Sequence, residues 1–117
     1  MSFIPGVLER GDGRPRLRAA DGVFIPVGET RATSGQRVEI GIRPEHYRVV
    51  DENAGFPFKV EVVEPTGAET HVFGTIAGAA VRCVFRERVA ATPGQMLRLD
   101  VETEHVHVFA PDSGLRL

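Results

Sequence analysis

The feature that most constrains the fold of this chain is an alternation of apolar and polar residues that ends at a proline. Val38, Ile40 and Ile42 alternate with charged or small residues over 37–43. Because successive side chains of an extended strand point to opposite faces, this period of two predicts a half-buried β-strand. Pro44 ends that strand, since it has no N–H to donate and holds the preceding residue in an extended conformation.

The same alternation recurs along the chain and predicts a protein made of short strands. We expect strands over 3–8, 16–19, 23–27, 38–42, 47–50, 56–62, 69–76, 81–86, 97–101 and 106–108. Asp21-Gly22 has the composition of a two-residue hairpin turn. One face of the strand predicted over 56–62 is expected to be apolar and to carry Phe56, Phe58, Val60 and Val62. No segment has a helical period, so the pattern predicts an all-β fold and favours an OB-like Greek-key barrel.

Length and composition predict one soluble globular domain over residues 1–117. The single cysteine, Cys83, excludes an internal disulfide and lies between Val81 and Phe85 on an expected core face. The chain has no apolar run long enough for a transmembrane helix, and its first residues lack the layout of a signal peptide.

The sequence argues against nucleic-acid binding, which OB barrels often carry out with aromatic platforms and a basic groove. The formal net charge is −2, and the chain has no Trp and one Tyr. Most of the seven Phe residues fall on apparent core faces. We therefore expect no nucleic-acid partner.

Two polar groups flank predicted turns. The first follows the Pro44 bend and comprises Arg43, Glu45 and His46, and the second surrounds a turn near residue 67 and comprises Glu64, Glu69 and His71. Each group has two interpretations. Its charges can form internal ion pairs that fix the turn, or they can face a partner subunit or regulator.

His105 and His107 are two residues apart, so on a strand both would point to one face, as in a His-x-His metal site. This pattern leaves open a small cupin-like metalloenzyme. The competing interpretation places both imidazoles on a solvated or interface face, because no second spaced ligand pair is present. We expect no catalytic residue, resident metal or cofactor in this chain.

Four segments carry a resemblance to a known family. They are Phe3–Gly6, Gly41–His46, Glu64–Thr70 and His107–Gly114, with sequences FIPG, GIRPEH, EPTGAET and HVFAPDSG. In this order they resemble the opening, signature, central turn and closing segment of the C-terminal regulatory domain of maltose- and glycerol-phosphate-type ABC importer ATP-binding subunits. This is the transport-associated OB (TOBE-type) domain. Ala110 departs from the pattern, which usually has Asp after the Phe.

The resemblance implies an OB-like barrel of the MOP/TOBE kind with a regulatory and pairing role at the cytoplasmic face of the membrane. The implied partners are a second copy of the ATP-binding subunit, the membrane permease subunits, and a regulatory protein or small effector. The chain has no G-x-x-x-x-G-K-[ST] phosphate loop and only one Lys, Lys59. We therefore expect a fragment that does not hydrolyse ATP, with ATP and Mg²⁺ bound by a missing ATPase domain.

A free-standing oxyanion- or small-ligand-binding module of molbindin type remains an alternative function. Proteins of that type capture anions with backbone N–H groups and Ser, Thr or Lys side chains at subunit interfaces. With one Lys, anion capture by this chain would depend on Arg side chains or on the backbone.

Overall fold

The fold is all-β and is described by a computed structural model for residues 1–11 and 13–117. The described strands are β1 (Ser2–Arg10), β2 (Pro15–Arg18), β3 (Phe24–Pro26), β4 (Arg37–Ile42), β5 (Tyr47–Val49), β6 (Phe56–Pro65), β7 (Thr70–Ile76), β8 (Ala79–Phe85), β9 (Met96–Val101) and β10 (His107–Phe109). Three 3-10 turns join them: η1 (Ala20–Gly22), η2 (Pro44–His46) and η3 (Thr103–His105). Every predicted strand is present, with ends shifted by a few residues.

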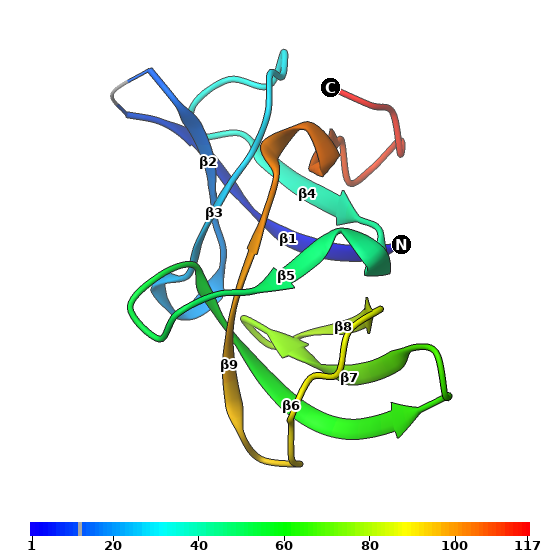
Figure 1. The fold of residues 1–117 in the computed structure, drawn as a ribbon. Helices are drawn as coiled ribbons and strands as arrows, with labels where there is room; N and C mark the ends of the chain where they lie inside the picture. The colour runs from blue at the N-terminus through cyan, green and yellow to red at the C-terminus, as the bar shows by residue number, and fades with distance from the viewer. Residues whose placement is uncertain (12) are drawn as a thin grey trace.

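The strands form two antiparallel five-stranded sheets. The first has the order β10-β4-β1-β2-β3 and the second β5-β9-β6-β7-β8. They occupy the upper and lower halves of Figure 1. The chain leaves the first sheet through η2 and returns to it through η3, so the last strand pairs beside β4. The predicted OB-like barrel architecture is confirmed.

The core is built by the alternation seen in the sequence. On β4, Val38, Ile40 and Ile42 are at most 1% exposed, and Ile40 lies opposite Ile4 of β1. The largest side chains below 2% exposure are Phe56, Phe58, Ile4, Leu8, Leu17, Ile25, Ile40, Ile42, Ile76, Leu99, Val38 and Val60. Both sheets therefore direct one apolar face into a shared interior, where burial of apolar area supplies most of the favourable free energy of folding.

The Asp21-Gly22 turn was predicted correctly. Asp21 and Gly22 both have positive φ, of 60° and 71°, and the Val23 N–H donates to the Ala20 carbonyl at 3.2 Å. Two successive left-handed residues are the geometry of a type I′ turn, for which Asp-Gly is a favoured composition. The turn joins β2 to β3, although the paired residues begin only at Arg18 and Phe24.

Two predictions about core faces were wrong. Val62 is 49% exposed, because the pairing of β6 with β7 shifts register between Val60 and Val62 and thereby turns Val62 outward. Only three Phe residues, Phe56, Phe58 and Phe85, are buried. Phe3 and Phe24 are 47% and 40% exposed, so the outer surface carries more aromatic area than the pattern suggested.

Gly74 marks a close approach between β7 and β6, where it lies opposite Val60. A Cβ at this position would overlap the Lys59 carbonyl oxygen and would lie 2.8 Å from Phe58 Cζ. The backbone of β6 cannot yield without disturbing its ladder to β9. A side chain at position 74 is therefore incompatible with the packing of the second sheet.

We predict that Gly74→Ala lowers the free energy of unfolding by about 1–3 kcal/mol, the usual cost of overpacking. The measurement is the urea midpoint followed by circular dichroism. Gly11→Ala is the matched control, because no heavy atom lies within 4 Å of its added Cβ. Equal urea midpoints for the two variants would contradict this prediction, because β6 and β7 could then move apart without a loss of stability.

Candidate functional site

The Pro44 bend positions the first polar group. Arg43 is extended, with φ −73° and ψ 146°, and Pro44 begins η2 with its side chain buried. The His46 N–H donates to the Arg43 carbonyl at 3.0 Å and closes the turn. The bend leaves Arg43 and Glu45 exposed and His46 half-buried. The predicted bend is therefore present, and it exposes the Arg43 and Glu45 side chains.

The internal ion pair considered for this bend is not formed. Within residues 1–11 and 13–117, no ion pair joins Arg43 to Glu45. The pKa of Glu45 lies below its ordinary value mainly because its own backbone N–H donates to the carboxylate, an effect that outweighs the opposing effect of burial and is reinforced by the nearby His46, Arg43 and Arg86. Glu45 and Arg86 line the same hollow between η2 and the end of β8.

His46 stacks on His105. The two rings lie 3.7 Å apart between centroids, with an interplanar angle of 18°. His46 belongs to η2 and His105 to η3, so the stack joins the two turns by which the chain leaves and re-enters the first sheet. Nδ1 of His46 is buried and makes no hydrogen bond to any described residue. The contact links the signature segment to a histidine 59 positions away in the sequence.

His105 and His107 do not form the pair expected on one strand. The backbone is a 3-10 turn over Thr103–His105, and β10 begins only at His107. No group of three or more His, Cys, Asp or Glu side chains suited to a metal ion occurs in the described part of the chain. The geometry therefore gives no support to the cupin-like metalloenzyme interpretation.

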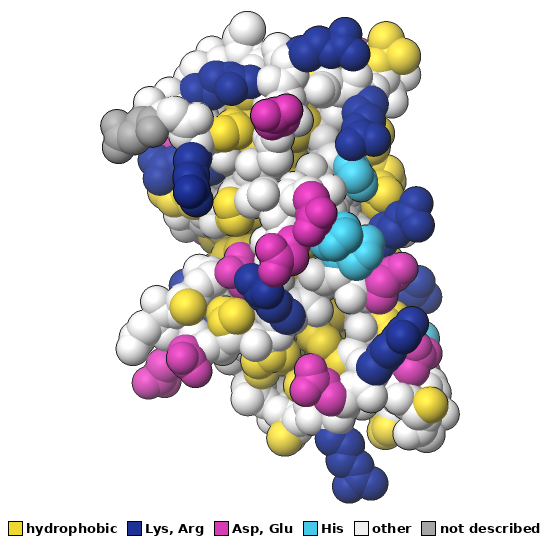
Figure 2. Space-filling view, turned by 45° about the horizontal axis from the view of Figure 1, so that its top comes forward, with side chains coloured by type: hydrophobic (Ala, Val, Ile, Leu, Met, Phe, Trp, Pro, Cys, Tyr) yellow, Lys and Arg dark blue, Asp and Glu magenta, His cyan; other side chains and the backbone are white. Residues whose placement is uncertain are grey.

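His107 lies against Gly41 of β4 and has a buried Nδ1 without a hydrogen-bond partner in the described structure. Its pKa is lowered, first by burial and then by the charges of Arg116 and Arg43 and by His105 and His46. Figure 2 shows histidine side chains gathered where the two halves of the molecule meet, with basic and acidic side chains beside them. The three histidines therefore form one region of the surface.

The second polar group lies on the β6–β7 hairpin. The Thr66 N–H donates to the Glu69 carbonyl at 2.8 Å and closes the turn, and Glu64 lies opposite His71 in the ladder. His71 Nε2 lies 3.4 Å from Glu69 Oε1. This pair is partly exposed, and such pairs contribute on the order of 0–1 kcal/mol. Among the residues that the structure describes, no hydrogen bond or ion pair joins this group to the one at η2, and β8 lies between them.

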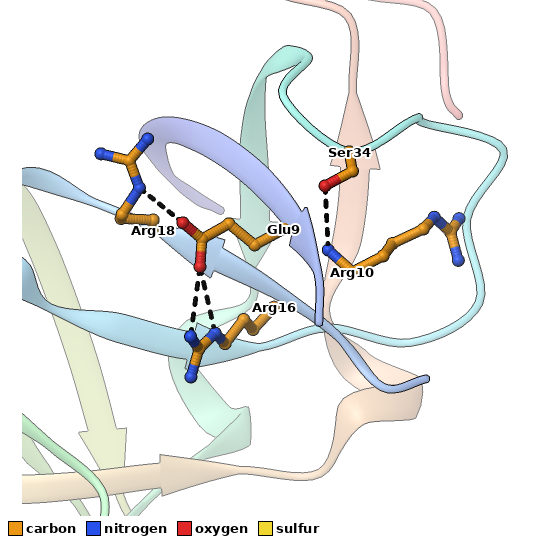
Figure 3. Close-up of polar contacts among 5 residues, drawn as sticks. All are labelled: Glu9, Arg10, Arg16, Arg18 and Ser34. Atoms are coloured by element: carbon orange, nitrogen blue, oxygen red, sulfur yellow. Dashed lines mark hydrogen bonds and ion pairs between the residues drawn. The ribbon is translucent and has the colours of Figure 1, made fainter. Parts of the chain in front are cut away.

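A third polar cluster, which the sequence pattern did not indicate, lies on the first sheet. Glu9 of β1 accepts hydrogen bonds from two arginines of β2, Arg16 at 3.2 Å and Arg18 at 2.7 Å (Figure 3). The Arg16 guanidinium also lies 4.0 Å above the Phe24 ring. Arg10 is held separately, since its N–H donates to Ser34 Oγ and its side chain to backbone carbonyls of Thr30 and Ala32. The pairing of β1 with β2 brings the side chains of Glu9, Arg16 and Arg18 together.

Cys83 is fully buried, as predicted, and burial raises the pKa of its thiol. Tyr47 lies nearby at 3% exposure, and its pKa is raised by burial and by Cys83. Neither group is ionised near neutral pH, and neither reaches solvent. Both are therefore core residues and have no place in a nucleophilic site.

We predict that stability falls as the pH falls through about 6.5, the ordinary pKa of His in an unfolded chain. The folded pKa of His107 is lowered, so the unfolded state binds the proton more readily and protonation favours unfolding. His107→Gln should flatten this part of the stability profile, measured by urea unfolding between pH 7.5 and 5.5. Gly11→Ala, which changes no titratable group, is the control and should keep the wild-type slope. A wild-type slope in His107→Gln would contradict the assignment.

Comparison with known proteins places the chain in a family. Residues 1–47 match the family model described as MalK OB fold domain, and residues 40–109 match the one described as TOBE domain. A Brucella abortus protein with the provisional name ATP-binding protein is 43% identical over all of this chain and 32% of its own length. An ABC transporter ATP-binding protein of Sinorhizobium fredii is 37% identical over the whole chain and 31% of its own length.

The sn-glycerol-3-phosphate import ATP-binding protein of a Ruegeria species is 30% identical, again over the whole chain and 32% of its own length. The chain thus spans about a third of these relatives. A solved structure of the molybdate-binding protein ModG aligns with TM-score 0.73 over 93% of this chain and 95% of ModG, but its 11% identity shows the fold alone. The chain belongs to the TOBE-domain family, in the MalK-type OB-fold form found in ABC-transporter ATP-binding proteins.

Proposed function

We propose that this chain is the regulatory and pairing domain of the ATP-binding subunit of an ABC importer for sugars or glycerol phosphate. The observation that carries the proposal is the joint match of two family models over residues 1–109, together with ATP-binding relatives that align with the whole chain. The names of relatives indicate the solute class, since they include a glycerol-3-phosphate importer and a sulfoquinovosyl glycerol transporter.

ATP hydrolysis would belong to the part of the parent protein outside this chain. The sequence contains no phosphate loop, and a P-loop ATPase needs that backbone cradle and its lysine to hold ATP and Mg²⁺. The chain would therefore act on the ATPase indirectly, by holding two subunits in register while their ATP-binding parts open and close. Its location would be peripheral to the cytoplasmic face of the membrane, beside the permease subunits. Among the described residues, no helix has the length and apolar character to cross a bilayer.

Regulation would operate at the two exposed polar groups. Arg43, Glu45 and His46 lie at the Pro44 bend, while Glu64, Glu69 and His71 flank the β6–β7 turn, so both groups lie where paired strands end. A regulatory protein or small effector that contacts such a group changes transport only if it binds one state of the subunit dimer better than the other. Within the described residues, Arg43 and Glu45 form no internal ion pair, so their side chains are suited to charge-assisted contacts with such a partner.

Oxyanion binding of the ModG kind is the competing function. The shared architecture supports it only at the level of the fold, because unrelated functions recur on OB-like barrels. The chain's single lysine, Lys59, is exposed on β6 of the second sheet, whereas Arg16 and Arg18 lie on β2 of the first sheet. The family assignment therefore favours the transporter function.

We predict that the native product of the gene is about three times the size of this chain, because the chain spans 32% of its relatives. Immunoblotting of cells that express the chromosomal gene measures this size. A band at 12.8 kDa would contradict the proposal and make ligand binding by a free-standing domain the leading function.

Deleting this domain from the parent subunit should abolish or strongly reduce solute uptake while leaving ATP binding intact. Uptake of labelled glycerol 3-phosphate and of a panel of sugars measures the first effect, and binding of a fluorescent ATP analogue measures the second. The control is a subunit that carries Gly11→Ala in an otherwise complete domain. Uptake at the wild-type rate after deletion would refute a role in transport.

A further inference from the structure

An open hollow lies at one end of the first sheet, where β2 begins and β3 ends. Its volume is about 450 Å³, and its lining includes Arg14, Pro15, Arg16, Phe24 and Pro26. We call it the β2–β3 hollow. Small organic ligands occupy pockets of roughly 300–1,000 Å³. No acidic side chain belongs to the described lining, whereas two guanidinium groups do. The hollow is therefore suited to an anion and not to a metal cation.

Arg16 is held in a fixed position beside the hollow. It lies opposite Glu9 of β1 and opposite Pro26 of β3. Its Nε and Nη2 donate to Glu9 Oε1 at 3.3 and 3.2 Å (Figure 3), and its guanidinium carbon lies 4.0 Å from the centre of the Phe24 ring. The Arg16 side chain nevertheless stays 49% exposed. A side chain that is ordered in advance loses less conformational entropy when a ligand binds.

Positive charge exceeds negative charge among the described residues around the hollow. Glu9 accepts from Arg18 at 2.7 Å as well as from Arg16, so one carboxylate serves two guanidinium groups. Arg14, two positions before Arg16, is exposed and forms no ion pair with any described residue. Guanidinium groups bind phosphate oxygens through two parallel hydrogen bonds. The Arg14 side of the hollow is therefore suited to a phosphate group.

Phe24 and Pro26 supply an apolar wall on the other side. Both belong to β3, the last strand on its side of the first sheet, and the Phe24 side chain is 40% exposed. The C–H groups of a sugar ring can be buried against such rings while its hydroxyl groups remain in water. A bare oxyanion would fill only a small part of the hollow and would leave this wall in contact with water. A larger anion with a ring is the better match.

We propose that the β2–β3 hollow binds a phosphorylated sugar, with its phosphate group on Arg14 and Arg16 and its ring against Phe24 and Pro26. The site goes beyond the proposed function, which assigns no ligand to this part of the first sheet. It does not rest on transport, because binding is a property of the 117-residue chain itself.

The test is isothermal titration calorimetry of the 117-residue chain with glucose 6-phosphate, inorganic phosphate and glucose. Glucose 6-phosphate should bind at least about tenfold more tightly than inorganic phosphate, because its ring also buries apolar area. Glucose should show no measurable binding, since it lacks the group that the two arginines recognise. High salt should weaken the binding of both phosphate probes by screening the guanidinium charges.

Two kinds of variant test the two sides of the hollow separately. Arg14→Gln and Arg16→Gln should each weaken both phosphate probes by about tenfold, as expected for a lost charge-assisted hydrogen bond. Phe24→Ala should weaken glucose 6-phosphate much more than inorganic phosphate and so reduce the ratio of their affinities. The matched controls lie in the second half of the fold: Arg88→Gln removes an exposed arginine after β8, and Phe73→Ala removes a half-buried ring of β7. Circular dichroism and urea midpoints show that each variant is folded.

Four results would overturn the proposal. They are no saturable binding of glucose 6-phosphate, equal affinity for inorganic phosphate, an unchanged affinity ratio in Phe24→Ala, or control variants that weaken binding as much as the variants of the hollow. Vesicles of phosphatidylglycerol test a lipid headgroup as the other source of a phosphate group. Sedimentation of the chain with these vesicles, without binding of the soluble sugar phosphate, would also overturn the proposal.

The outcome of these titrations is separate from that of the transporter function. Absence of binding would leave that function standing, since the size of the gene product and the uptake assay decide it. Conversely, binding that follows the Arg14, Arg16 and Phe24 variants would support the site even if the uptake assay failed.

Discussion

The structure depends on β4, which supplies buried side chains to the core and lies between β1 and β10 in the first sheet. Its even-numbered residues Val38, Ile40 and Ile42 are buried in the shared core, and it pairs with β1 on one side and β10 on the other. Without this strand the two ends of the chain would have no common neighbour. The burial of three β-branched side chains in one strand fixes its register, because a slip of one residue would turn all of them to solvent.

The end of β4 determines where the polar chemistry lies. Pro44 stops the ladder and starts η2, so Arg43 and Glu45 leave the sheet at an exposed bend while His46 turns inward onto His105. That stack joins the exit from the first sheet to the return into it. The bend at Pro44 therefore leads to a contact between segments that are remote in sequence. His46 and His107 each have a buried Nδ1, and burial disfavours protonation of His107.

Strand identity and fold class were predictable because they follow from local alternation and turn chemistry. The Asp21-Gly22 turn, the buried Cys83 and the Pro44 bend all needed only their neighbours in the sequence. The prediction failed where pairing decides the outcome. Val62 continues an apolar alternation yet faces solvent, because a shift in the register with β7 reverses its side. The His105–His107 pair failed for a related reason, since η3 ends between them.

Local sequence pattern was enough to predict short strands around one apolar core, and four ordered motifs indicated the family. Those properties are encoded in residues close together along the chain, where the period of two and the backbone limits of Pro and Gly act directly. Folding brings Phe3, Gly41 and Phe109 together on the outer face of the first sheet and places His46 against His105. Both arrangements arise from cross-strand register and from the return of β10 to β4, which no local pattern specifies.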